Sequence, residues 1–445
     1  MGTILIIVYG IVIMVLAISS WKFNTSVENY LVAGRKQHKL LVVTSMLAST
    51  IGGALTLGQA SKTYSMGFPA IWFIIAGAIA HFLQGGLLSK KVRETEALTL
   101  PDMALKLVGQ RVQLLTSIFI VITWTGIAVA QFIATAKILV TITGVPYETG
   151  VVIAGVFLTI YTIIGGQKSI LKTDLFQFGV LSVALIGALA YLYITKPLPE
   201  GSIALPLFTS TFTVWHFLHY LIVMGGSYFI CPMMFGRLLS ADSPQTARKS
   251  SFLSGTGMLI FAFVITFIGL WVKGSVPDLQ KLDPLNFIAK NTLPPVLGFF
   301  LIFGLLAAIL STADTVLITG AGTLQNDIIK RKSVLGIRMF TIVIGTVAML
   351  IALFKSDILG IIIKTYNGYT AGIVPALFIA LMVKGKRTLN EPVLLAAMVL
   401  GYTLGIAGSF FPTESLPGIL FPLGGIAVSG AVSVLAAAVP AKHQV

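Results

Sequence analysis

The sequence has 445 residues, of which 56% are hydrophobic and only 10% are charged, and its mean hydropathy is +0.96. This composition leaves too little polar surface for a water-soluble globule, so we expect an integral membrane protein. The formal net charge of +15 would suit a nucleic-acid-binding protein, but basic residues on the cytoplasmic side of a membrane protein produce the same excess.

A membrane-spanning helix needs about 20 mostly apolar residues. Thirteen stretches meet this requirement: 2–20, 40–66, 68–89, 112–143, 147–167, 173–195, 212–236, 250–272, 294–325, 334–354, 357–383, 392–411 and 417–440. The loops between them are short and leave no room for a separate soluble domain. We therefore predict an all-α integral membrane protein with thirteen transmembrane helices.

The distribution of Lys and Arg predicts the orientation of these helices. If the N-terminus is outside, 22 of the 30 basic residues fall in cytoplasmic segments and five in outer loops. The cytoplasmic segments are 21–39, 90–111, 168–172, 237–249, 330–338, 384–387 and the C-terminal tail. Cytoplasmic loops normally carry this excess, so we expect the plasma (inner) membrane, a cytoplasmic C-terminus and no nucleic-acid partner.

Residues 2–20 have no preceding basic residue and are followed by Lys22, which predicts a retained span rather than a signal peptide.

Two spans in corresponding positions contain glycine pairs. Gly52-Gly53 lies in the second span, and Gly225-Gly226, with Pro232 after it, lies in the seventh. Such pairs of interrupted helices are typical of transporters built from inverted repeats, although glycine pairs also serve close helix packing alone. The repeat interpretation divides the chain into a first helix with an interfacial segment, two five-helix repeats and two C-terminal helices. Their ranges are 1–39, 40–196, 212–383 and 384–445.

Two carboxylates fall inside predicted spans. Asp174 lies near the start of the sixth span and Asp314 in the ninth, whereas the other 13 of the 15 acidic residues fit loops or span ends. A charge at this depth costs at least about 2.5 kcal/mol, so each acid needs a compensating cation, proton or dipole. In the predicted topology both acids lie toward the cytoplasmic side, where they can meet at one depth.

Residues around Asp314 form a face rich in oxygen. Ala308, Ser311, Thr312 and Thr315 follow i, i+3, i+4, i+7 spacing and share one side of a helix. Hard cations bind oxygen ligands, and an interrupted helix supplies free carbonyl oxygens as further ligands. Hydroxyls in membrane helices also bond back to their own helix, but the presence of Asp314 favours a cation site.

Four stretches, taken together, resemble the sodium:solute symporter family. They are LASTIGGALTLGQASKTYSMG (47–67), YTIIGGQKSILKTDLFQ (161–177), AAILSTADT (307–315) and YNGYTAGIVP (366–375), and PMMFGRLLSAD (232–242) is also similar. The resemblance implies a LeuT-like five-plus-five inverted repeat with two broken helices.

The resemblance also implies the binding residues. A main sodium site would use Ala48, Ile51, Ala308, Ser311 and Thr312. A second sodium site, which only some members have, would use Asp174, Ser311, Asp314 and Thr315. Asp314 departs from the family, because some members have serine or alanine there, so the number of sodium ions stays open.

The implied substrate pocket is mostly apolar. Its residues would be Leu55, Gln59, Phe73, Ile74, Gly77, Cys231 and Asn367. So few polar groups argue against a polyhydroxylated sugar and favour an amino acid or a short carboxylate. Lys62 could contact an anionic group of the substrate, or its side chain could extend to the outer membrane interface.

These observations predict sodium-coupled symport of a small organic solute by alternating access, with Na⁺ as the coupling ion. One alternative is a proton-coupled carrier that uses Asp174 or Asp314, and another is a transporter-like membrane sensor. The chain ends at Val445, soon after the last predicted span, without a signalling domain. An enzyme is not expected, because no nucleophile and base pair or cofactor loop is present at suitable spacing. The expected partners are the small-molecule substrate and the lipid bilayer, with no obligate protein partner.

Overall fold

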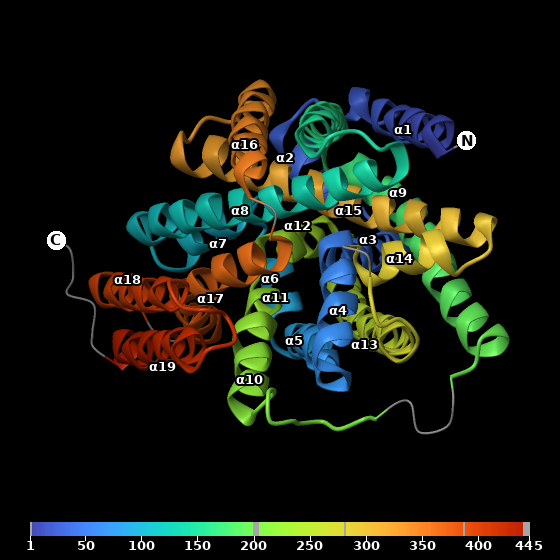
Figure 1. The fold of residues 1–445 in the computed structure, drawn as a ribbon. Coiled ribbons are helices and arrows are strands. Elements are labelled where there is room, and N and C mark those ends of the chain that lie inside the picture. Colours follow the sequence, from blue (N-terminus) through green and yellow to red (C-terminus); the bar gives the residue numbers. More distant parts are fainter. Residues whose placement is uncertain (1, 199–203, 280–281, 356, 386–387, 439–445) are drawn as a thin grey trace.

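The structure of the protein is a computed structural model that describes residues 2–198, 204–279, 282–355, 357–385 and 388–438. Within these ranges every regular element is a helix (Figure 1). The long helices outside the two broken spans are α1 (Gly2–Ile18), α5 (Trp72–Leu87), α8 (Gln110–Thr143), α9 (Tyr147–Thr195), α13 (Pro244–Ser275), α15 (Pro295–Thr323), α16 (Val334–Phe354), α17 (Ile358–Val383), α18 (Glu391–Gly408) and α19 (Leu416–Ala438).

Short helical pieces connect the long helices. The α-helical ones are α2 (Val27–Val32), α6 (Ser89–Glu94), α7 (Leu100–Leu107) and α14 (Pro284–Asn291). The 3₁₀ turns are Trp21–Phe23, Ala33–Arg35 and Phe68–Ile71, and a π-helical turn, Leu324–Ile328, extends α15. Local sequence explains several boundaries: α13 begins with Pro at its first position and with Ser243, whose side chain accepts a hydrogen bond from the Thr246 amide.

The first broken span consists of α3 (Lys39–Thr50) and α4 (Gly53–Met66), which meet at an angle of 46°. Gly52 between them has an extended backbone, with φ −60° and ψ 160°. The interruption lies at the glycine pair that the sequence indicates.

The second broken span consists of α10 (Val214–His219), a π-helical turn (Tyr220–Met224), α11 (Gly225–Phe229) and α12 (Pro232–Ser240). Its break lies at Ile230 and Cys231, whose backbones are extended. Gly225 and Gly226 therefore do not form the break, contrary to the sequence-based expectation. They allow close packing instead, because a Cβ on Gly226 would lie 2.6 Å from the Thr370 Cγ2 atom.

The described helices confirm a multi-span membrane protein but not the count of thirteen. Ten are long and apolar enough to cross a bilayer, or eleven if α3 and α4 form one span. The 49 residues of α9 form two helical segments that are joined at a kink. Gly166 interrupts α9 with φ 67° and ψ 171°, between two of the predicted spans. Helix α1, with 17 residues, is slightly short of a span.

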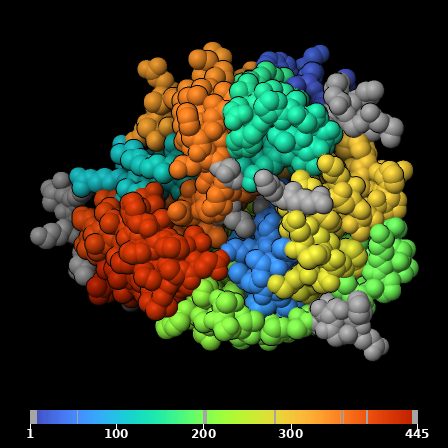
Figure 2. Space-filling model, in the orientation of Figure 1, coloured from blue at the N-terminus to red at the C-terminus, as the bar shows by residue number. Residues whose placement is uncertain are grey.

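Helix α15 lies at the centre of the molecule, where it contacts α8, α9, α3, α4 and α12 (Figure 1). Helices α18 and α19 pack on each other and on α17 at one flank (red in Figures 1 and 2). Helices α3 and α12, one from each broken span, are also connected, because Gln37 before α3 exchanges backbone hydrogen bonds of 3.0 and 2.9 Å with Ser240 and Asp242 at the end of α12. The division into repeats at 40–196 and 212–383 stays a prediction.

Candidate cation-binding site

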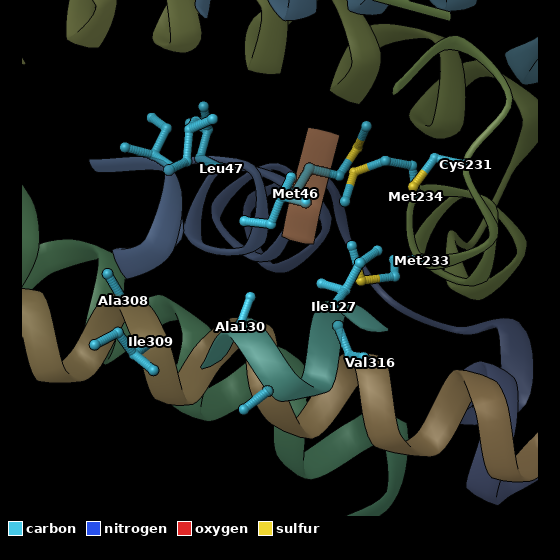
Figure 3. Packing of buried hydrophobic residues seen from close by; sticks show 14 of the residues in the cluster. Met46, Leu47, Ile127, Ala130, Cys231, Met233, Met234, Ala308, Ile309 and Val316 are labelled. Carbon is cyan, nitrogen blue, oxygen red and sulfur yellow. The ribbon is translucent and has the colours of Figure 1, made fainter. Parts of the chain in front are cut away.

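The break between α3 and α4 lies directly against α15. A Cβ on Gly52 would lie 2.1 Å from Thr312 Oγ1, and a Cβ on Gly53 would lie 2.0 Å from Ile309 Cγ1. Only glycine permits this approach of the backbone to the neighbouring helix. Figure 3 shows the surrounding core, in which Ala308 and Ile309 of α15, Leu47 of α3 and Cys231 of the second break belong to one apolar cluster.

Four of the five residues predicted for the main sodium site are brought together here. Ser311 Oγ lies 2.9 Å from the Ala48 carbonyl oxygen and 2.8 Å from the Ala308 carbonyl oxygen. Thr312 Oγ1 lies 3.1 Å from the Ala308 carbonyl oxygen. Ile51, the fifth residue, lies at the break, where its carbonyl oxygen accepts a hydrogen bond of 3.1 Å from Thr56 Oγ1.

The chemistry of this cluster suits a monovalent cation. Each hydroxyl has one hydrogen and can donate to only one carbonyl oxygen at a time. The hydroxyl and carbonyl oxygens therefore carry more lone pairs than the hydroxyl hydrogens can satisfy. The Ser311 and Thr312 side chains are at most 5% exposed, which removes them from bulk water. A cation between α3 and α15 would satisfy these oxygens and join the two helices. Sodium binding itself stays a prediction.

A second polar cluster lies next to the first one and contains a residue that the sequence analysis missed. Arg237 on α12 is fully buried and pairs with the fully buried Asp174 on α9, with 3.1 Å between Nη2 and Oδ2. The same nitrogen donates to Thr315 Oγ1 at 2.9 Å and to Ser49 Oγ. Residues 237–249 were assigned to a cytoplasmic loop, but α12 continues to Ser240 and places Arg237 inside the protein.

The remaining groups of this second cluster come from α3 and α15. Arg237 Nε donates to Ser45 Oγ at 2.7 Å, and Ser45 Oγ donates in turn to Asp174 Oδ2. Asp314 Oδ1 accepts a hydrogen bond of 3.2 Å from Thr315 Oγ1. Within the described part of the chain, Asp174 Oδ1 and Asp314 Oδ2 are buried without a hydrogen-bond partner. Asp174 and Asp314 thus belong to one cluster, as the predicted topology requires.

Comparison with known proteins shows similarity to one transporter family. A model of the sodium:solute symporter family matches residues 30–196. The sodium/proline symporter of Staphylococcus aureus is 24% identical over 414 residues, which cover 86% of this chain and 81% of that protein. The chain is therefore similar to sodium:solute symporters along most of its length.

Solved structures of symporters share this fold. A substrate-bound Na⁺-coupled sialic acid symporter superposes with a TM-score of 0.78 at 15% identity, covering 100% of this chain and 99% of its own. The nucleobase-cation-symport-1 family transporter MHP1 superposes with a TM-score of 0.56 at 14% identity, covering 93% and 94%. These similarities confirm the predicted LeuT-like, all-helical architecture.

The residues that the symporter resemblance assigns to substrate lie on three helices and at the second break. Leu55 and Gln59 lie on α4, Phe73, Ile74 and Gly77 on α5, Cys231 at the second break and Asn367 on α17, and all are buried. Gln59 Nε2 donates to Thr266 Oγ1 at 3.1 Å. A Cβ on Gly77 would lie 2.5 Å from Met258 Cε, so this glycine provides close packing between α5 and α13.

His219 is a further buried polar residue and lies beside Asn367. Its Nε2 atom lies 3.1 Å from Asn367 Oδ1, and both side chains are at most 2% exposed. The hydrogen bond joins α10 of the second broken span to α17. No sequence spacing links residues 219 and 367, so only the fold could show this contact.

Lys62 lies in the C-terminal half of α4 and forms an ion pair with Glu414 in the loop between α18 and α19. The Lys62 side chain is 13% exposed. In Figure 2 blue residues of the α4 region reach the surface beside the red C-terminal helices. The anion that Lys62 contacts in this state is therefore a carboxylate of the protein, and a contact with substrate stays a prediction.

Proposed function

We propose that the protein is a secondary active transporter that couples inward sodium flow to the symport of a small organic solute. The observation that carries this proposal is the convergence of carbonyl and hydroxyl oxygens from the α3–α4 break and from α15. This set includes Ala48, Ala308, Ser311 and Thr312, at hydroxyl-to-carbonyl distances of 2.8–3.1 Å. The match of residues 30–196 to the sodium:solute symporter family model and the similarity to sodium/proline symporters support the assignment.

A sodium ion at this position would act by joining two elements. Because its ligands come from both α3 and α15, it binds best in the state in which these helices touch, and it shifts the population toward that state. If that state also binds substrate more tightly, bound sodium raises the affinity for substrate. Bound substrate must then raise the affinity for sodium by the same factor. The membrane potential adds about 2.3 kcal/mol per charge for each 100 mV and drives accumulation.

The substrate class follows from the lining of the predicted pocket. Leu55, Phe73, Ile74 and Cys231 are apolar, and Gln59 and Asn367 are its two amides. Such a lining favours an amino acid or a short carboxylate over a sugar, because a sugar would leave several hydroxyls without partners. We place the protein in the plasma membrane with its N-terminus outside and its C-terminus in the cytoplasm, in agreement with the distribution of basic residues.

A thermal-shift screen of the purified protein tests this proposal. Amino acids, short carboxylates, nucleobases and sugars are added one at a time, with sodium or with an equal concentration of choline. We expect at least one amino acid or short carboxylate to raise the unfolding temperature much more in sodium, because ligands that bind the folded state stabilise it. Equal stabilisation in sodium and choline by every ligand that binds would contradict sodium coupling.

A proton-coupled carrier is the second candidate, and the unpartnered carboxylate oxygens of the buried Asp174 and Asp314 favour it. The two candidates differ in their driving force. Uptake into proteoliposomes in the absence of sodium, driven by an inwardly directed proton gradient, would support the proton carrier. Uptake that requires sodium at equal pH on both sides supports the symporter.

A further inference from the structure

The position predicted for a second sodium ion contains an arginine. Asp174 and Thr315, two of the four predicted ligands, already accept hydrogen bonds from Arg237 Nη2, at 3.1 and 2.9 Å. Oxygen-bound metal ions such as calcium lie about 2.3–2.6 Å from their ligands. An ion bound to these same oxygens would need the space that the guanidinium nitrogen fills.

Arg237 is held firmly in this position. Its Nε atom donates to Ser45 Oγ at 2.7 Å, its Nη1 atom donates to the Met233 carbonyl at 3.1 Å, and its side chain is fully buried. All three guanidinium nitrogens therefore have acceptors inside the protein. Releasing the side chain would leave Asp174 as an unpaired buried charge, which is strongly unfavourable.

The formal charges then leave one negative charge in excess. Asp174 and Arg237 cancel each other, and Asp314, also fully buried, remains. Two tyrosines, Tyr9 from α1 and Tyr161 from α9, are buried in the same part of the core and contribute no formal charge when neutral. A carboxylate buried at this depth either takes up a proton or is balanced by a nearby positive charge.

The main sodium site can supply that positive charge, because it lies next to this cluster and its predicted ligands are neutral oxygens. Ser49 Oγ accepts from Arg237 and donates to the Ser311 carbonyl at 3.0 Å. Thr315 Oγ1 lies 3.2 Å from both the Ser311 carbonyl oxygen and Asp314 Oδ1. Single hydrogen bonds thus connect the acidic cluster to a residue of the main site.

We propose that Arg237 takes the place of a second sodium ion, so that the protein binds one sodium ion, whose charge is balanced by Asp314 from outside its set of ligands. This proposal rests on the proposed function, because it assumes sodium at the main site. It also gives Asp314 a role: one sodium ion, one arginine and two carboxylates make an electrically neutral group in the core.

Binding of sodium-22 to the purified full-length protein tests the proposal without a known substrate. We expect saturation at one ion per chain. Thr312→Ala should weaken this binding because it removes a ligand. Asp314→Asn should keep one ion per chain but weaken its affinity about tenfold or more, because it removes a nearby opposite charge in a medium of low dielectric constant. Thr315→Val, which keeps every charge, should also retain one ion.

Two ions per chain in the wild-type protein, falling to one in Asp314→Asn or Thr315→Val, would overturn the proposal and leave sodium coupling intact. Unchanged sodium affinity in a folded Asp314→Asn variant would also overturn it. Absence of saturable binding in the wild-type protein would overturn the proposed function together with this inference. The elution profile and unfolding temperature of each variant, compared with the wild type, show whether it is folded.

Discussion

Individual side chains carry most of the proposed chemistry, and the sequence revealed only some of them. Ser311 and Thr312 could be recognised because helical spacing places them on one face with Ala308. Arg237 could not, because an arginine near the end of a span usually extends to the membrane interface. The direction of its side chain depends on how α12 packs against α3 and α9, and a linear pattern does not specify that packing.

The buried pair of Asp174 and Arg237 should contribute strongly to stability. Asp174→Asn keeps the shape of the side chain but leaves Arg237 as an unpaired buried charge, which we expect to cost about 3–5 kcal/mol. The matched control is Glu28→Gln, which breaks the pair of Glu28 and Arg35, where the Glu28 side chain is 53% exposed. The control should cost at most about 1 kcal/mol. Unfolding in detergent measures both, and similar losses would contradict the buried pair.

At the scale of the helices, a glycine pair proved to be an ambiguous signal. Gly52-Gly53 lies at a break because the backbone must approach α15 there, and Gly225-Gly226 lies inside a helix because α5 and α17 pack closely against it. The two patterns look alike in sequence, since both a break and a close contact favour glycine. Pro232, which opens α12, was the better marker of the second break.

A methyl group at Gly52 should disturb the cation site. In Gly52→Ala the new Cβ would lie 2.1 Å from Thr312 Oγ1, so the break and α15 must separate. Overpacking of this kind costs about 1–3 kcal/mol, and if the bound state bears this cost, sodium affinity falls by about 5- to 150-fold. Gly86→Ala is the control, because a Cβ at Gly86 has nothing within 4 Å. Sodium titrations of the two variants should differ, and equal affinities would contradict the position of the site.

At the scale of the whole molecule, composition was sufficient to predict a helical membrane protein with many spans, but the count of thirteen spans was not confirmed. In α9 the non-helical backbone of Gly166 lies close to the boundary between two predicted spans, 147–167 and 173–195, so the structure and hydropathy divide this segment at nearly the same place. Helix α1, with 17 residues, is slightly short of a span. Contacts such as that of His219 with Asn367 depend on the packing of distant helices, so they could not be predicted either.

Alternating access should change the exposure of Cys231, the only cysteine in the chain. It lies at the second break and is 1% exposed. We expect sodium to speed the reaction of Cys231 with a small thiol reagent, because sodium favours a state open to substrate, and a bound substrate to slow it. Cys231→Ser supplies the background. Equal labelling rates without sodium, with sodium, and with sodium plus the substrate found by the screen would contradict this cycle.

The central claim is that sodium binds between the α3–α4 break and the hydroxyls of α15. The most direct test measures the unfolding temperature of the protein as sodium is added and determines the sodium concentration that gives half of the maximal rise. This concentration is compared among the wild-type protein, Thr312→Ser and Thr312→Ala. We predict that Thr312→Ser, which keeps the hydroxyl, stays within about twofold of the wild type, and that Thr312→Ala needs about tenfold more sodium. The same sodium requirement in all three proteins would contradict the claim.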